Sequence, residues 1–126
     1  MTHKDNVYRG EIYYVDFEQN AGSSMNGLRP ALVISNDVGN QHGPTVIVAA
    51  ISSSIKAMWL PTHLIVEYNK GLKTKSMVML EQIKTVDKAC LQEKVGSVSA
   101  DFLEKVDRAL TVSVGLDEKF NRTGEC

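Results

Sequence analysis

The feature of this chain that most constrains its fold is the order of its predicted strand and helix segments. Short runs rich in β-branched and aromatic residues, separated by turn-forming residues, fill most of the sequence. One amphipathic helix pattern follows them near the C-terminus. Short strands that end in a single helix predict a mainly β fold of the α+β type, a small β-barrel with the helix packed on it.

Six segments have the character of strands. The first alternates around aromatic and β-branched residues, whereas the second and third are continuously apolar, as strands buried on both faces are. Gly96 weakens the sixth. Turn-forming residues fill positions 36–44, between the second and third strands. The predicted strands span residues 9–17, 30–35, 45–51, 60–67, 76–86 and 91–98.

The helix pattern spans residues 99–115. Apolar side chains recur there every three or four residues over about four turns. Ser99 is expected to cap the helix, Asp101 favours its dipole, and Gly115 is expected to end it. We therefore predict a single domain over residues 1–126, with the barrel at about 8–98, the helix at about 99–115 and a polar tail at 116–126.

The composition is that of a globular protein that builds its own core. The chain has 126 residues, of which 43% are hydrophobic and 23% charged. No apolar run approaches the ~20 residues of a membrane span, and the N-terminus has no apolar signal core, so we expect a cytoplasmic protein that does not enter membranes. Cys90 and Cys126 do not make a disulfide framework, and Cys90 is expected to be a small buried hydrophobe.

The charge balance restricts how the chain meets nucleic acid. A net charge of −1 and a pI of about 6.3 exclude a protein that tracks long nucleic acid by charge alone. Residues 69–88 nevertheless hold five lysines against Glu81 and Asp87. This stretch is either a basic face, which the nearly neutral net charge of the whole chain conceals, or a loop of solvated lysines. The charge pattern alone does not distinguish these two interpretations.

Arg29 stands where a loop meets a strand. The segment before it, residues 20–27, is rich in Gly, Ser and Asn, and the apolar run after Pro30 is the second predicted strand. A guanidinium there is held by a rigid element yet faces the loop. Such a position suits a side chain that grips a phosphate.

Several kinds of chemistry have no motif in this chain. It contains no P-loop, no dinucleotide fingerprint and no G-x-S-x-G elbow. The histidines lack the spacing of a zinc site, and no pair of carboxylates stands out, so we expect neither a metal nor a cofactor. For His63 a structural or surface role is favoured over a catalytic one. An enzyme of this kind works with arginine, hydroxyls and amides.

RNA is a substrate that suits these groups, because it carries its own nucleophile. Attack of the 2′-hydroxyl on the adjacent phosphate needs alignment, a proton acceptor, a proton donor and stabilisation of the charge that develops on phosphorus. Arginine binds phosphate oxygens through its planar fork, and a hydroxyl at the end of a strand can bind the same oxygens.

Several motifs occur together in an order and spacing that is specific as a set. They are Arg9-Gly10-Glu11-Ile12-Tyr13, the Gly-rich loop, the run from Gly27 to Asp37, the run from Pro44 to Ile51, Leu60-Pro61-Thr62-His63 and the run from Leu80 to Asp87. From about Tyr8 to Leu116 the chain resembles the MazF/PemK (Kid) toxins of bacterial toxin–antitoxin modules, and most of all the MazF branch of Gram-positive bacteria.

The resemblance implies a fold, an activity and partners. The fold is an SH3-like barrel with a C-terminal helix, assembled as a homodimer. The activity is a metal-independent, sequence-specific endoribonuclease that cuts single-stranded mRNA, leaves a 2′,3′-cyclic phosphate and a 5′-hydroxyl, and so arrests translation and growth. The partner is a labile MazE-type antitoxin whose flexible tail covers the RNA site.

The resemblance also assigns catalytic positions. Arg29 matches the family's catalytic arginine, and Ser52 stands where the family usually has threonine. Serine keeps the hydroxyl but loses the methyl that stiffens the side chain. Ser53 is the alternative source of the hydroxyl. A guanidinium is a poor proton acceptor at neutral pH, so we assign Arg29 first to phosphate binding and leave its part in proton transfer open.

Base recognition is expected from polar residues around the same groove. Bases of single-stranded RNA can be splayed out and read on their edges. Asn36 is as well explained as a turn cap as by RNA binding, whereas a functional role is favoured for Gln82. The candidates are Asn20, Ser23 and Ser24 in the loop, with Asn36, Ser53 and Gln82.

Two other functions remain open for such a barrel. CcdB-type toxins share it but poison DNA gyrase through residues at the end of the helix, without the arginine–hydroxyl pair. A catalytically inactive barrel that binds RNA or protein is the third possibility. Cleavage of a defined single-stranded RNA in EDTA separates the nuclease from both.

Overall fold

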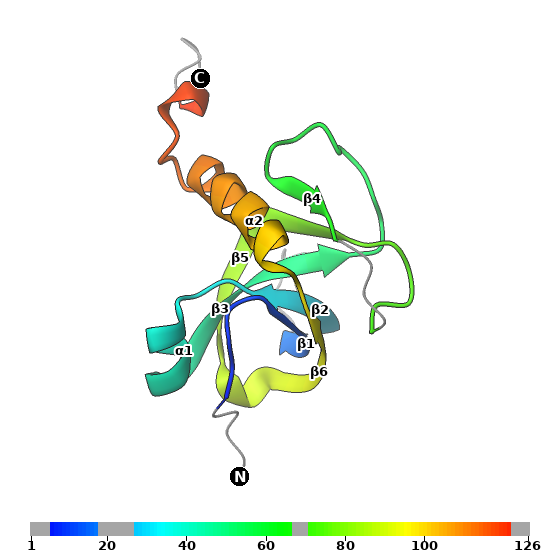
Figure 1. Ribbon diagram of the computed structural model, residues 1–126. Helices are drawn as coiled ribbons and strands as arrows, with labels where there is room; N and C mark the ends of the chain where they lie inside the picture. Colours follow the sequence, from blue (N-terminus) through cyan, green and yellow to red (C-terminus); the bar gives the residue numbers. More distant parts are fainter. Residues whose placement is uncertain (1–5, 18–26, 67–70, 122–126) are drawn as a thin grey trace.

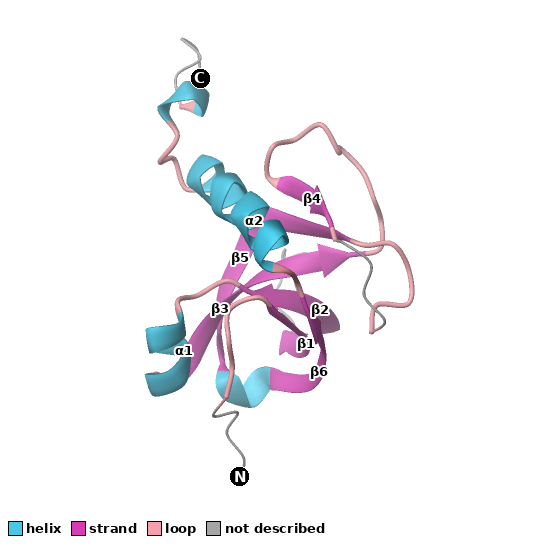
Figure 2. Ribbon diagram, viewed as in Figure 1, coloured by secondary structure: helices cyan, strands magenta, loops and turns pink. Residues whose placement is uncertain are grey.

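Strands make up most of the regular structure. The computed structural model describes residues 6–17, 27–66 and 71–121, and Figures 1 and 2 show the arrangement of its elements. In chain order these elements are β1 (Glu11–Phe17), β2 (Gly27–Val33), α1 (Asp37–His42), β3 (Thr45–Ser52), β4 (His63–Ile65), β5 (Met77–Asp87), the 3₁₀ helix η1 (Lys88–Cys90), β6 (Leu91–Ser97), α2 (Ala100–Ser113) and the 3₁₀ helix η2 (Glu118–Phe120).

The six strands form one antiparallel sheet. Their order across it is β4-β5-β3-β2-β1-β6. The sheet curls strongly, and α2 packs on it against β4 and β5 (Figure 1). A mainly β architecture with a C-terminal helix, as the sequence predicts, is confirmed.

The C-terminal helix begins and ends where its sequence signals indicate. Ser99 Oγ accepts a hydrogen bond from the backbone N–H of Phe102 at 3.0 Å and so caps the first turn. Gly115 follows the helix with φ of 81°, a conformation that glycine adopts without strain. No helix within the described residues is long and apolar enough to cross a membrane.

The segment that the sequence predicts as turns, residues 36–44, contains the short helix α1. Asn36 makes the difference, because its Oδ1 accepts from the backbone N–H of Gly39 at 2.7 Å and satisfies a donor of the first helical turn. Asp37 in that turn is favourable to the helix dipole. A dense set of turn formers was therefore the signal of a capped helix.

The fourth strand and the tail also differ from prediction. The strand was expected over residues 60–67, but β4 covers only His63–Ile65, because the backbone before it folds into turns. In those turns Leu60 N–H donates to Ala57 O and His63 N–H to Leu60 O. In the predicted polar tail, η2 forms over residues 118–120.

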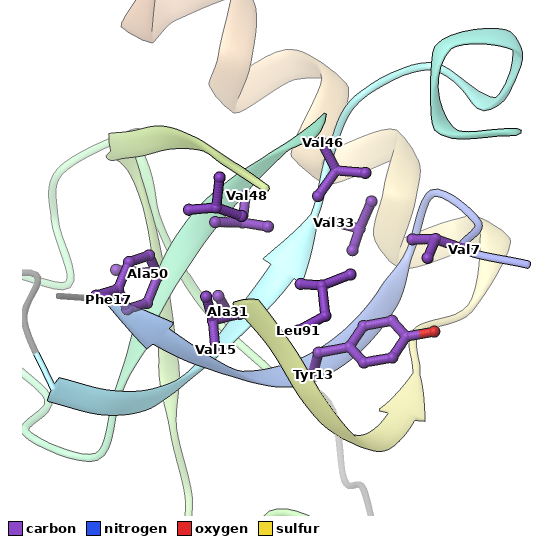
Figure 3. Packing of buried hydrophobic residues seen from close by; sticks show 11 residues of the cluster. Val7, Tyr13, Val15, Phe17, Ala31, Val33, Val46, Val48, Ala50 and Leu91 are labelled. Carbon is purple, nitrogen blue, oxygen red and sulfur yellow. The ribbon is translucent and has the colours of Figure 1, made fainter. Parts of the chain in front are cut away.

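Two hydrophobic cores lie on opposite faces of the sheet. In β1, Tyr13, Val15 and Phe17 face the inside of the curl, whereas Ile12 faces α2. Figure 3 shows the first core, where side chains of β1, β2, β3 and β6 meet. The second core packs Phe102, Val106 and Ala109 of α2 on residues of the sheet. Both cores fix the strands that carry the candidate site.

Candidate functional site

Arg29 lies inside β2, where the sheet holds its backbone. The sequence places the start of this strand at Pro30, but β2 begins at Gly27, since residues 27–30 pair with β1. Arg29 stands opposite Val15, and its side chain is exposed. The cation is therefore carried by a more rigid element than a loop junction.

One cavity brings Arg29 together with Ser52, the last residue of β3. Its volume is about 370 Å³, and Ser53 and Lys73 also line it. Among the described residues that line this cavity, the charged ones are Arg29 and Lys73, so its electrostatic character is positive. The hydroxyl groups of the lining belong to Tyr14, Ser52, Ser53, Ser54, Thr74 and Ser76. Guanidinium, ammonium and hydroxyl donors around one cavity suit a phosphate group.

The hydroxyl of Ser52 is oriented by the backbone that follows it. Ser52 Oγ accepts from the N–H of Ser54 at 3.0 Å, which turns the chain at the end of β3. As a donor, Ser52 Oγ lies 3.4 Å from the carbonyl oxygen of Ser54, beyond the ~2.7–2.8 Å typical of O–H···O bonds. The oxygen is thus fixed in place, while its proton can turn to a phosphate oxygen.

The residues that were predicted for base recognition are spread over different surroundings. Asn20, Ser23 and Ser24 lie outside the described residues. Ser53 lines the cavity beside Arg29. Asn36 caps α1 and Gln82 lies half-buried in β5, and neither belongs to the lining of this cavity.

Sequence reasoning did not single out five polar or charged residues of the lining, namely Tyr14, Ser54, Lys73, Thr74 and Ser76. The lysine-rich stretch at residues 69–88 was a signal for Lys73, but it did not show which lysine turns toward Arg29. The lysines of this stretch differ in role, because Lys88 is buried and Lys75 is exposed outside the cavity.

His63 fastens the loop between β3 and β4. Its Nε2 lies 2.7 Å from Glu81 Oε2, and its Nδ1 lies 3.1 Å from the carbonyl oxygens of both Lys56 and Ala57. The hydroxyl of Thr62 donates to Glu81 Oε1 at 2.8 Å. These contacts tie the loop that follows Ser52 to β5, and His63 itself does not line the cavity.

The protonation of this pair follows from its surroundings. Burial lowers the pKa of His63, but the hydrogen bond and charge of Glu81 and the two carbonyl oxygens outweigh it, so the pKa lies above its usual value. Burial raises the pKa of Glu81, but the hydrogen bonds from His63 and Thr62 bring it below its usual value. Both shifts favour the charged pair.

The described residues offer no cluster for a metal ion. Within the described residues, no three His, Cys, Asp or Glu side chains come together in a way that could hold one. Cys90, also in this part of the chain, is half-buried beside the first core.

A curled antiparallel sheet and a C-terminal helix define the class as a small barrel-like protein, and this one carries a cavity whose charged residues, within the described part of the chain, are cations. Residues 8–114 match the family described as the PemK-like, MazF-like toxin of type II toxin–antitoxin system. The chain belongs to this family. It is 42% identical to the Endoribonuclease EndoA of Bacillus subtilis (strain 168) over 111 residues, which are 87% of this chain and 96% of that protein.

Solved structures show the same fold. An endoribonuclease in complex with its cognate antitoxin, from a mycobacterial species, superposes with a TM-score of 0.73 at 24% identity, over 89% of this chain and 98% of that one. MazF from Deinococcus radiodurans superposes with a TM-score of 0.73 at 23% identity, over 86% of this chain and 96% of that one. At such identities the superpositions establish the fold.

Proposed function

We propose that this toxin is a sequence-specific, metal-independent endoribonuclease that cleaves single-stranded mRNA and thereby arrests translation and growth. The observation that carries the proposal is the positive cavity in which Arg29 and Ser52 lie together. The 42% identity to a protein named as an endoribonuclease supports it.

The reaction uses a nucleophile that the RNA supplies. The 2′-hydroxyl oxygen attacks the adjacent phosphorus, a P–O2′ bond forms and the P–O5′ bond breaks. The proton of the 2′-hydroxyl passes to an acceptor, and the departing 5′-oxygen takes up a proton. The products are a 2′,3′-cyclic phosphate and a 5′-hydroxyl, and the step balances without a cofactor.

The cavity residues act on the phosphate that reacts. Arg29 binds its non-bridging oxygens and stabilises the negative charge that grows on them in the transition state. Ser52 donates a hydrogen bond to the same oxygens from a position fixed by the backbone of Ser54. Because a guanidinium stays protonated at neutral pH, we assign Arg29 to charge stabilisation and not to proton acceptance. Lys73 supplies a second cation for the RNA backbone.

We further propose that the toxin forms a homodimer and binds a MazE-type antitoxin in the cytoplasm. Large apolar side chains are exposed in the loop before β4 and after α2, as in Trp59 at 81% and Leu116 at 73%. The two segments approach each other, because Pro61 and Phe120 line one cavity of about 400 Å³. Exposed apolar surface of this kind is typical of protein interfaces. Sedimentation of the purified toxin, alone and with antitoxin, tests both assemblies.

Cleavage of a defined RNA tests the proposed activity. Purified toxin is incubated in EDTA with a single-stranded RNA and with the same RNA carrying a 2′-deoxy nucleotide at the cut site. We expect cleavage of the first RNA at few positions and none at the deoxy site, because the nucleophile is absent there. Cleavage at the deoxy site would refute the mechanism. If the RNA stays intact and the protein inhibits DNA gyrase, the protein is a gyrase poison. If the RNA stays intact but is bound tightly, the protein is an inactive barrel that binds RNA.

A further inference from the structure

A β-bulge interrupts the pairing of β1 with the edge strand β6. Tyr13 stands opposite Lys94 and Val15 opposite Leu91, with a register shift between the two pairs. Two residues of β6, Gln92 and Glu93, therefore oppose the single residue Tyr14. Bulges of this kind redirect side chains and are frequent next to functional sites.

The redirected side chains form a second cavity beside the first. It has a volume of about 470 Å³ and is lined by Tyr14, Asp16, Leu28, Gln92 and Glu93. Tyr14 and Leu28 also line the cavity of Arg29. The two cavities therefore share a wall formed by these two residues.

The second cavity differs from the first in its chemistry. Its charged residues within the described part of the chain are Asp16 and Glu93, which accept hydrogen bonds when ionised and repel phosphate. Tyr14 offers an aromatic ring, and Leu28 is 62% exposed. Carboxylates beside a ring suit a nucleobase that stacks on the ring and donates from an exocyclic amino group.

The strands that carry the lining are fastened together, but internal hydrogen bonds and ion pairs leave some polar side chains of the lining without a partner in the ranges that the structure describes. Next to the bulge, Lys94 Nζ lies 2.8 Å from Glu11 Oε2, and Glu11 Oε1 lies 3.1 Å from the hydroxyl of Tyr13. These contacts fasten β6 to β1. Among the described residues, the side chains of Gln92 and Glu93 have no hydrogen-bond or ion-pair partner. They remain available to a ligand.

Protection of a sheet edge is the simpler explanation for a bulge in β6, because bulges and charges discourage pairing with other chains. Edge protection requires neither a concave surface nor a wall shared with the phosphate cavity. The position of Tyr14 between Arg29 and the bulge favours a binding role.

We propose that this cavity is a nucleobase subsite that selects an amino-bearing base next to the phosphate held by Arg29. The inference rests on the proposed ribonuclease function and deepens it. Adenine, cytosine and guanine carry an exocyclic amino group, whereas uracil does not. Glu93 and Asp16 accept from that group, and the ring of Tyr14 stacks on the base.

Removal of single amino groups from the RNA tests the subsite. Starting from an RNA that the toxin cuts, each nucleotide beside the cut is replaced by its amino-free analogue: purine riboside for adenosine, inosine for guanosine or pyrimidin-2-one riboside for cytidine. For the wild-type toxin we expect one such replacement to lower kcat/KM about tenfold. In Glu93→Ala or Asp16→Ala the same replacement has little effect, because the acceptor is gone.

Glu104→Ala is the matched control, since Glu104 is an exposed carboxylate on α2 outside both cavities. It should keep the full penalty of the wild type. Thermal melting of each variant checks that it is folded. An equal penalty in wild type, Glu93→Ala and Asp16→Ala overturns the subsite while leaving the ribonuclease intact.

A binding measurement keeps the two proposals separate. Oligonucleotides made wholly of 2′-deoxy nucleotides, which need no known cut site, are titrated against wild type and Glu93→Ala with and without the amino group of each base in turn. An affinity difference that appears only in the wild type supports the subsite even if no RNA is cleaved, an outcome that would refute the ribonuclease alone. Equal affinities in both proteins refute the subsite.

Discussion

Arg29 of β2 and Ser52 of β3 line the same cavity from neighbouring strands. β2 and β3 pair Ala31 with Ala50, and Arg29 lies two residues before Ala31 while Ser52 lies two residues after Ala50. Alternate residues of a strand share a face, and both alanines belong to the core inside the curled sheet. The pairing of these alanines therefore brings Arg29 and Ser52 to the same end of the strand pair, where the cavity lies.

Arg29→Ala is expected to lower the cleavage rate by about 10²–10³, because loss of one preorganised donor to a developing oxyanion has a cost of this size. Since the side chain is exposed, the melting temperature should change little. Gel-based rates on a defined RNA measure the effect. Arg108→Ala on α2, outside the cavity of Arg29, is the control and should keep its rate. A fully active Arg29→Ala toxin contradicts the assignment.

Ser52→Thr should leave the rate unchanged or raise it. Threonine keeps the hydroxyl and its added methyl restricts the rotamer, which reduces the entropy lost on orienting the oxygen. Ser52→Ala removes the donor and should slow cleavage strongly, whereas Ser53→Ala should have a smaller effect. Single-turnover rates on one RNA give the comparison. If Ser53→Ala is the slower of the two alanine variants, Ser53 supplies the hydroxyl.

Much of the fold follows from local patterns in the sequence. The strands β1, β3, β5 and β6 and the helix α2 appear where alternation, apolar runs and the Ser99 cap predict them. These signals lie within a few residues of one another along the chain. β2 begins earlier than predicted because residues 27–30 pair with β1 across the intervening segment, and such pairing is not visible in the residue types of 27–30 alone.

The candidate site could be predicted only in part, for the same reason. Arg29 and Ser52 come from motifs, and the structure brings them to one cavity. Lys73 and Tyr14 have no motif of their own, because only the curl of the sheet brings them there. The bulge at Gln92 arises from the register between β1 and β6, and residue types alone do not specify that register.

Lys73→Ala should weaken RNA binding and make it less sensitive to salt. A cation that neutralises one phosphate of a single strand contributes a slope of about −0.7 in a plot of log affinity against log salt concentration. Loss of Lys73 should reduce the slope by about that amount and raise KM more than it lowers kcat. Titrations of a non-cleavable oligonucleotide at several salt concentrations measure the slope.

Lys75→Ala is the matched control for this variant. Lys75 lies in the same loop and is exposed, but it does not line the cavity. Its removal takes away the same charge and should leave most of the slope in place. Equal slopes for Lys73→Ala and Lys75→Ala show that the loop attracts RNA only through its net charge.

The contact between His63 and Glu81 is expected to stabilise the fold in a limited range of pH. The folded state raises the pKa of His63 above its ordinary 6.5, so this contribution is complete below that pH and is lost as the pH rises through the folded value. It lowers the pKa of Glu81 below 4.5, so that contribution is complete above pH 4.5 and is lost as the pH falls through the folded value. Both contributions are complete between about pH 4.5 and 6.5.

Thermal melting of Glu81→Gln against the wild type at pH 5.5 and pH 9 tests this. We expect the variant to melt lower at pH 5.5, by a few degrees, because a partly accessible ion pair contributes about 0.2–1 kcal/mol. At pH 9 the gap should narrow, since His63 is then neutral. Lys105→Gln, an exposed helix residue away from the pair, is the control and should show no such pH dependence. A gap of the same size at both pH values would show that the charge of His63 does not contribute to it.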